Sequence, residues 1–261
     1  MFKAARPVAI VVETPLHAGS GSELGIVDLP IQRERHTNHP KIEASSLKGC
    51  LREAFEGHEE NEACKALKKD YTTLCINPVF GPENGDEHAG ALGLTDARLL
   101  LFPVKSMKGV FAWITCPVIL NRLLQDLSMT RTLGSTVPSP EIGDNITALI
   151  NTIPSTSNLL LTDGKIVLEE FTFPVTTNAA CQSLAQWVAE HVLPQDDAFA
   201  YWRAKITQDL VVLSDDDFCD FVSMSTEVIT RTKISSETGT VQSGMLWTEE
   251  YLPADSMLYT L

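Results

Sequence analysis

The stretch 94–127, "LTDARLLLFPVKSMKGVFAWITCPVILNRLLQDL", combines two apolar runs with a helical pattern and therefore indicates the class of fold. Its two apolar runs, 94–104 and 109–115, are rich in Leu, Val, Phe, Trp and Ile, which is typical of consecutive strands. The run 117–127 predicts a helix that opens on Pro117, a residue favoured in the first turn. Strands and helices mix along the chain without strict alternation, so we expect an α+β fold around an antiparallel sheet.

The flanking sequence predicts further elements on both sides of this stretch. Towards the N-terminus we expect a buried strand at 8–15, a helix at 44–57, a weaker helix at 63–74 and a loop at 77–91. Towards the C-terminus we expect a strand at 165–173, helices at 179–193 and 197–206, and a β-hairpin over 227–253 that turns around Gly239. The segment 131–163 is rich in Thr, Ser, Pro and Asn, which indicates an insertion.

The predicted helix "ASSLKGCLREAFEG" carries both an apolar and a basic pattern. Ser45 or Ser46 is expected to cap its N-terminus. Lys48 and Arg52 are four residues apart and therefore share one face. An apolar stripe is formed by Leu47, Leu51, Ala54 and Phe55.

Composition indicates an ordinary globular chain of 261 residues, with 44% hydrophobic and 21% charged residues. The longest apolar stretch has 12 residues and contains Pro117, which is too short to cross a bilayer. The N-terminal sequence lacks the pattern of a signal peptide. Six cysteines form no C-x-x-C pair, so reduced thiols in a cytoplasmic protein are expected.

The charge is unevenly distributed along the chain. The net charge is −14, which by itself argues against nucleic-acid binding. However, 12 of the 34 acidic residues lie in three clusters without Lys or Arg, at 53–62, 83–87 and 213–220. Residues 31–52 instead hold five basic and two acidic residues. Two interpretations stay open: a positive groove on an acidic body, or a surface on which opposite charges interleave.

Several nucleotide and metal motifs are excluded by their spacing. Gly19, Gly21 and Gly25 follow a predicted strand, but no Gly-Lys-Ser/Thr ends the turn and no helix opens there. The turn can still offer backbone N–H groups to a phosphate. His36 and His39 have no further ligands at suitable spacing, so a structural metal site is not expected there.

Two residues of this region have open alternatives. His17 is either a proton donor or acceptor, or a hydrogen-bonded loop histidine. Asp28 lies between Val27 and Leu29, and a carboxylate in this setting is more often exposed on a loop than catalytic.

Three long motifs carry a family resemblance. They are "TPLHAGSGSELGIVDLPIQRERHTNHPKIEASSLKGCLR", "FGPENGDEHAGALGLTDARLLLFPVKSMKGVFAWITCPVIL" and "LWTEEYLP". From about residue 5 to its end, the chain resembles the backbone subunit of type III-B CRISPR effectors. This is the family of the fourth Cmr protein, within the RAMP superfamily.

The resemblance implies a single RAMP domain over 1–261, with an RRM-like, ferredoxin-type palm, insertions and a β-hairpin thumb at about 228–246. It implies that copies stack into a filament along a CRISPR guide RNA together with other Cmr subunits. Members usually continue beyond "LPADSMLYTL" with a helix, a second Gly-rich loop and a final strand.

The implied activity is that of a cytoplasmic endoribonuclease subunit that is active in the assembled complex. Target RNA complementary to the guide would be cut at regular intervals, with the RNA's own 2′-OH as the nucleophile. A divalent metal, Mg²⁺ or Mn²⁺, would assist at Asp28. The alternative is a non-catalytic, structural RNA-binding subunit of the same kind of complex.

The resemblance also implies roles for individual residues. Those matched to the catalytic site are Asp28, His17, Glu249 and Glu250. Those matched to RNA binding are Ser20, Ser22, Arg33, Arg35, Ser45, Ser46, Lys48 and Arg52.

Overall fold

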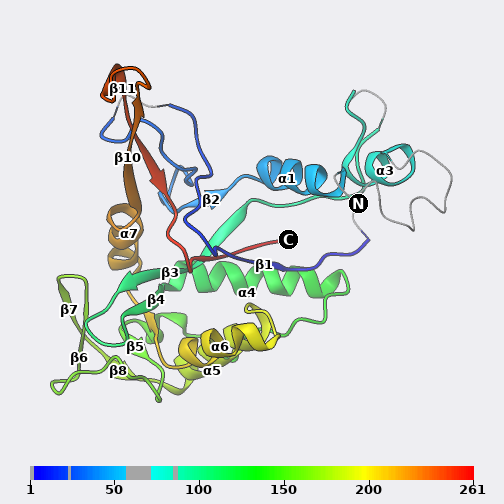
Figure 1. The fold of residues 1–261 in the computed structure, drawn as a ribbon. Coiled ribbons are helices and arrows are strands. Elements are labelled where there is room, and N and C mark those ends of the chain that lie inside the picture. Colours follow the sequence, from blue (N-terminus) through cyan, green and yellow to red (C-terminus); the bar gives the residue numbers. More distant parts are fainter. Residues whose placement is uncertain (1–2, 23–24, 57–71, 85–87) are drawn as a thin grey trace. The chain divides into compact units, whose positions relative to one another are not determined.

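The computed structural model describes residues 3–22, 25–56, 72–84 and 88–261. The chain divides into two compact units: unit 1 comprises 1–41 and 98–261, and unit 2 comprises 42–97. Helices and strands are mixed throughout (Figure 1), which confirms the predicted α+β class.

A large mixed sheet forms the centre of unit 1. Its order is β1 (Val8–Val11), β12 (Met257–Thr260), β3 (Ala97–Lys105), β4 (Phe111–Thr115), β9 (Leu210–Val212), β5 (Thr152–Ile153) and β8 (Thr176–Thr177). The pairs β1–β12, β12–β3 and β3–β4 are antiparallel. The pairs β4–β9 and β5–β8 are parallel. The expected antiparallel sheet is therefore present at β1, β12, β3 and β4, but strands from distant parts of the chain extend it with parallel pairs.

The hydrophobic core is built on β3 and β4, as their apolar runs predict. Leu101, Phe102 and Ile114 have no exposed surface, since both faces of these strands are covered. The indole N–H of Trp113 is buried too and donates to the carbonyl of Asp255 at 2.8 Å. Up to residue 206, the described part of unit 1 contains five helices: α4 (Pro117–Thr132), η2 (Ile146–Leu149), α5 (Ala179–His191), η3 (Asp197–Phe199) and α6 (Ala200–Ile206).

The N-terminal strand is less buried than its apolar sequence predicts. Among the strands of the described ranges, β1 ends the sheet and pairs with β12 alone, and the side chain of Val8 is 48% exposed. An edge strand has one neighbour, so an apolar run does not by itself place it in the core.

The single strand expected at 165–173 is wrong, because the segment folds back on itself. β6 (Lys165–Leu168) and β7 (Phe171–Pro174) pair antiparallel. Glu169 adopts a φ of +51° at the turn between them, and its N–H donates to the carbonyl of Lys105 at 2.8 Å. A turn without Gly, Pro or Asn gave no sequence signal.

The acidic cluster at 213–220 contains a helix that the sequence analysis missed. α7 runs over Asp215–Met224, and Ser214 caps it by accepting the N–H of Asp217 at 3.1 Å. Three aspartates occupy the first turn, where negative charge complements the helix dipole. This part of the acidic excess therefore stabilises a helix end.

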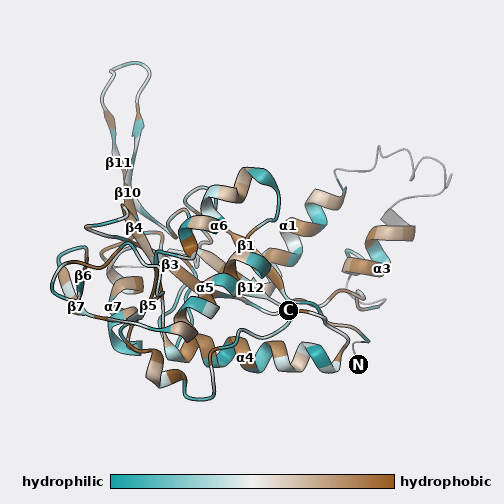
Figure 2. Cartoon of the chain, turned by 90° about the horizontal axis from the view of Figure 1, so that it is seen from below, coloured by the Kyte–Doolittle hydropathy of each residue, from teal (hydrophilic) through white to brown (hydrophobic). Residues whose placement is uncertain are grey.

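The hairpin predicted around Gly239 is confirmed. β10 (Glu227–Ile234) pairs antiparallel with β11 (Val241–Tyr251), and Gly239 has a φ of +68°. Figures 1 and 2 show the hairpin extending away from the sheet of unit 1. Four of its apolar side chains are more than half exposed: Val228, Ile234, Val241 and Leu246. They are therefore not part of the core.

Unit 2 contains α1 (Ala44–Glu56), a short π-helix (Thr72–Ile76) and α3 (Asn77–Phe80), and the two-residue strand β2 (Lys41–Ile42) spans the boundary with unit 1. The predicted loop at 77–91 is wrong at its start, because Pro78 opens α3. Most of the helix expected at 63–74 lies outside the described residues. No residue of α1 is buried, and Phe55 is 51% exposed, so the predicted apolar stripe lies on the surface of this unit.

Two further expectations concern membranes and cysteines. None of the helices in the described ranges combines the length and hydropathy needed to cross a bilayer. Five cysteines are described and all are free, but only Cys116 and Cys181 are buried.

Candidate active site around strand β11

The predicted catalytic residues meet at the C-terminal part of β11. Side chains alternate along a strand, so Thr248 and Glu250 face one side, and Trp247, Glu249 and Tyr251 face the other. The segment after the Gly-rich turn runs beside this part of the strand. The N–H of Leu29 donates to the carbonyl of Thr248, and the N–H of Glu250 donates to that of Leu29, both at 3.0 Å. Backbone pairing thus joins segments that are far apart in sequence.

Asp28 is an exposed carboxylate held at one oxygen. Its Oδ2 accepts the N–H of Thr248 at 2.7 Å and the hydroxyl of Thr248 at 2.9 Å. Within the described ranges no hydrogen bond reaches its Oδ1. Two hydrogen bonds from Thr248 lower the pKa of Asp28 below its ordinary value. The larger effect comes from the backbone N–H and the next from the hydroxyl. Asp28 is therefore ionised at neutral pH and keeps one oxygen for another ligand.

His17 is fixed by its Nδ1, which lies 2.7 Å from the carbonyl oxygen of Glu250. A carbonyl can only accept, so Nδ1 carries the proton and Nε2 has a free lone pair in the neutral ring. A Cβ at Gly19 would lie 2.8 Å from Nε2, so glycine leaves room for the ring there. The ring also contacts Tyr251, with 5.5 Å between the ring centroids.

Glu250 is a buried carboxylate, and both of its oxygens accept hydrogen bonds from protein donors. Its Oε1 accepts from Arg33 at 2.5 Å and from the hydroxyl of Thr226 at 2.7 Å, and its Oε2 accepts the N–H of Ile31 at 3.0 Å. Burial alone would raise the pKa of Glu250, but these three donors outweigh it, with Arg33 first, and the pKa is lowered. The burial of Glu250 and its contact with Arg33 indicate that these two side chains form a structural ion pair.

Glu249 belongs to a separate network on the other face of β11. It accepts from the indole of Trp247 at 2.8 Å, from the hydroxyl of Tyr251, and from Arg231 on β10 at 3.2 Å. These hydrogen bonds, with that of Trp247 first, lower the pKa of Glu249 to about 2. Arg231 also donates to the hydroxyl of Tyr251 at 2.8 Å. The network ties the two strands together at the base of the hairpin.

The residues of unit 1 predicted to bind RNA differ in availability. Ser20, Ser22 and Arg35 are exposed, and Arg35 forms no side-chain hydrogen bond with the described part of the chain. The hydroxyl of Ser20 donates to the carbonyl of Pro30 at 3.2 Å. Arg33 is only 16% exposed, and besides Glu250 it donates to two backbone carbonyls. Arg35 is therefore better placed than Arg33 to meet a phosphate.

In unit 2, the predicted RNA-binding residues lie on α1. Ser45 and Ser46 fall within its first turn instead of preceding it, and the N–H of Ala44 donates to Asp96 at 2.9 Å, so the predicted serine cap is wrong. Lys48 donates to the carbonyl of Leu92 at 2.9 Å. Arg52 pairs with Glu56 at 2.7 Å and donates to the carbonyl of Gly81 at 2.8 Å. Both cations thus hold the loop after α3 against α1.

Sequence reasoning missed the residues that hold the predicted ones in place. They are Thr248, which binds Asp28, and Arg231, Trp247 and Tyr251, which bind Glu249. The alternation of "LWTEEY" assigns these side chains to two faces. It does not reveal which segment lies against each face.

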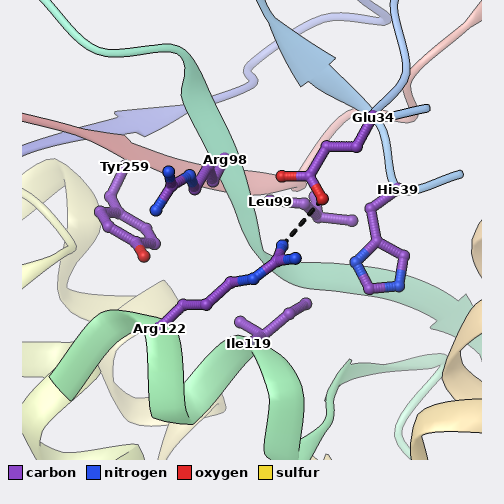
Figure 3. A pocket seen from close by; sticks show the side chains of 7 residues that line it. All are labelled: Glu34, His39, Arg98, Leu99, Ile119, Arg122 and Tyr259. Atoms are coloured by element: carbon purple, nitrogen blue, oxygen red, sulfur yellow. Dashed lines mark hydrogen bonds and ion pairs between the residues drawn. The ribbon is translucent and has the colours of Figure 1, made fainter. Parts of the chain in front are cut away.

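A small cavity in unit 1 is closed by charged side chains (Figure 3). Arg122 of α4 points to Glu34 and donates to it at 2.8 Å, and Arg98 and Tyr259 both donate to Asp126 at 2.9 Å. Burial lowers the pKa of His39, which lines the same cavity. The space is too narrow to admit a water molecule, so this cluster is part of the fold.

The described residues form no ready-made metal site, since nowhere among them do three His, Cys, Asp or Glu side chains gather around one position. Magnesium, however, often needs only one or two carboxylates when substrate phosphates supply further ligands. The free Oδ1 of Asp28 fits such a minimal site.

Comparison with known proteins identifies the class. The RAMP superfamily profile matches residues 9–260, so the chain belongs to this superfamily. "CRISPR system Cmr endoribonuclease Cmr4" from Pyrococcus furiosus is 39% identical over 258 residues, covering 97% of this chain and 79% of the relative. Within the superfamily the chain therefore belongs to the Cmr4 family.

Solved structures support the same assignment. Oligomeric Cmr4 from Pyrococcus furiosus matches with a TM-score of 0.65 at 29% identity, over 97% of this chain and 78% of that chain. A chain of the Type III-B Cmr-beta complex bound to cognate target RNA matches with a TM-score of 0.71, over 99% of this chain and 84% of that chain. Its identity is 22%, so it supports the fold alone.

Proposed function

We propose that this chain is a guide-RNA-binding backbone subunit of a type III-B CRISPR effector, which cleaves complementary target RNA at regular intervals. The relationship to a Cmr endoribonuclease over nearly the whole chain supports the class of activity. The observation that carries the catalytic part is Asp28, an exposed, ionised carboxylate with one free oxygen, in the segment that matches the family's catalytic motif.

In the proposed reaction the 2′-oxygen of a target nucleotide attacks the adjacent phosphorus. The 2′-O–P bond forms, the P–O5′ bond breaks, and the products are a 2′,3′-cyclic phosphate and a 5′-hydroxyl. The carboxylate of Asp28, whose pKa is lowered, is a weak base, because proton transfer is most effective when the pKa is near the working pH. Asp28 therefore serves to orient the reacting groups of the RNA, and it supplies a fixed negative charge beside them.

His17 is the better candidate for proton transfer. Its Nδ1–H is held by the carbonyl of Glu250, which leaves Nε2 to accept the 2′-OH proton. The leaving O5′ takes a proton from solvent water, and His17 afterwards releases the proton that it accepted to solvent. Glu249 and Glu250 are assigned to holding the hairpin base and the Arg33 ion pair, because their oxygens are already occupied.

A divalent ion, Mg²⁺ or Mn²⁺, is part of the proposal for the assembled complex. Asp28 is the residue of this chain that would hold it through Oδ1. When bound, such an ion stabilises negative charge on phosphoryl oxygens. We expect excess EDTA to suppress cleavage and added Mg²⁺ or Mn²⁺ to restore it. Full cleavage in EDTA would remove the ion from the proposal.

The finer architecture is proposed on the same basis. We assign an RRM-like palm to the sheet of unit 1 and the RNA-displacing thumb to the hairpin 228–246. The expected partners are guide RNA, target RNA, further copies of this chain and other Cmr subunits, in the cytoplasm. Exposed Ser20, Ser22 and Arg35 are the best placed RNA contacts of unit 1, and Ser45, Ser46, Lys48 and Arg52 are the corresponding candidates of unit 2.

The test is a cleavage assay on the complete complex with an end-labelled target RNA complementary to the guide. We expect regularly spaced products that end in a 2′,3′-cyclic phosphate. A target with a single 2′-deoxy nucleotide at one cut position should resist cleavage there and be cut normally elsewhere. A non-complementary RNA of the same length is the control. Tight target binding without any cleavage would favour the alternative, a purely structural subunit.

A further inference from the structure

Thr248 holds Asp28 through a closed set of hydrogen bonds. Its N–H and its hydroxyl both donate to Oδ2 of Asp28, at 2.7 and 2.9 Å, and the hydroxyl oxygen accepts the N–H of Asp28 at 2.9 Å. Two donors on one oxygen restrict the rotation of the carboxylate. They leave Oδ1 as the oxygen available to a ligand.

From this geometry we infer that Thr248 is a positioning residue for the cleavage reaction, acting through the carboxylate of Asp28. The inference rests on the proposed function, in which Asp28 takes part in cleavage. Thr248 itself need not touch the RNA.

A purely structural role explains the hydroxyl less well. The Asp28 segment is already paired with β11 by the two backbone hydrogen bonds on either side of Leu29. The β-branched shape of Thr248 suits a strand, but valine has the same shape. What the hydroxyl adds is contact with the side chain and N–H of Asp28, together with a longer approach of 3.5 Å to the carbonyl of Ile26.

The position of Thr248 in β11 makes this arrangement specific. On the same face, Glu250 pairs with the partly buried Arg33, and on the other face Glu249 belongs to the hairpin network. Of these three consecutive residues, only Thr248 contacts Asp28 through its side chain.

The test compares Thr248→Val with Thr248→Ser in the complete complex. Valine keeps the shape and the backbone N–H, whereas serine keeps the hydroxyl. A hydrogen bond to a charged group is lost in Thr248→Val, so we expect its single-turnover cleavage rate to fall about tenfold. Target RNA affinity should stay unchanged, and Thr248→Ser should recover most of the rate. The matched control is Thr176→Val, which alters an exposed strand threonine of β8.

A double-mutant cycle separates positioning from a general structural effect. If Thr248 acts through Asp28, adding Thr248→Val to Asp28→Asn should change the remaining rate less than twofold, since interacting residues are non-additive. A tenfold further loss in the double variant would overturn the inference. An unchanged rate in Thr248→Val alone would overturn it as well.

The failure of the inference can be told apart from that of the proposed function. If Asp28→Asn abolishes cleavage and Thr248→Val does not slow it, the inference is wrong and the proposed function stands. If Asp28→Asn cleaves at the wild-type rate, the catalytic role of Asp28 is wrong, and the inference is wrong with it.

Discussion

Two carboxylates lie close together along β11 and have opposite environments. Asp28 is exposed and is held at one oxygen by Thr248. Glu250, two residues after Thr248 on the same face of β11, is 6% exposed and accepts hydrogen bonds at both oxygens. Asp28 belongs to the segment that follows the Gly-rich turn, and Glu250 of β11 accepts hydrogen bonds from Ile31 and Arg33 of the same segment.

The difference shows how β11 holds two carboxylates in different roles: Glu250 of the strand itself in an ion pair, and Asp28 of the neighbouring segment as an exposed group. The Glu250–Arg33 pair is satisfied by protein donors, so its removal should affect folding before chemistry. The Asp28 carboxylate retains unused acceptor capacity at the surface, so its removal should affect chemistry before folding. The following experiments test this division.

The largest expected effect is on the cleavage rate of Asp28→Asn. Misplacing reacting groups by about 1 Å can cost roughly 10²-fold in rate, and Asp28 is proposed to orient these groups, so we expect a loss of about 10²-fold or more at every cut position. RNA affinity should not fall, because a negative charge near phosphates is removed. The thermal midpoint should change little, since Asp28 is exposed. The control is Asp220→Asn, a change at an exposed carboxylate on α7.

The second effect is on the stability of Glu250→Gln. Breaking a buried ion pair leaves its partner uncompensated, so we expect a loss of about 3 kcal/mol in the free energy of unfolding. Denaturant unfolding measures this change, with Asp220→Asn again as the control. A loss no larger than that of the control would mean that the pair does not support the fold, and the contrast with Asp28 would disappear.

The third prediction concerns the pH dependence of that stability difference. The pKa of Glu250 is lowered in the folded state, so its contribution is present above its ordinary value of 4.5 and is lost as the pH falls through the folded-state pKa. A protonated Glu250 resembles Gln. The gap in thermal midpoint between wild type and Glu250→Gln should therefore be full near pH 7 and narrow below about pH 4.5. A gap that is independent of pH would show that charge is not its origin.

The smallest effect is expected for Arg35, an exposed cation in the segment that follows the Gly-rich turn. If Arg35 contacts one phosphate, Arg35→Ala should weaken RNA binding equally for unrelated sequences and lower the salt slope by about 0.7. Lys165→Ala, a change at an exposed lysine on β6, is the control. Loss of affinity for only some sequences would show that Arg35 contacts bases.

Much of the fold follows from the sequence where local signals are strong. The apolar runs of β3 and β4 are long enough to be central strands, and Pro117 marks the start of α4. Alternation and Gly239 predict the hairpin. The short strands β9 and β12 were missed, because three or four apolar residues resemble any other short buried segment.

In the candidate site, too, some features follow from the sequence and others do not. The sequence by itself determined the family, through long motifs, and therefore the candidates Asp28 and His17. It did not distinguish Glu249 from Glu250, which are neighbours of identical chemistry. Only the tertiary structure decided that Glu250 is buried against Arg33, 217 positions away, and that Thr248 holds Asp28, 220 positions away. Burial and hydrogen-bond partners depend on which distant segments lie against each face of a strand, and local sequence does not contain that information.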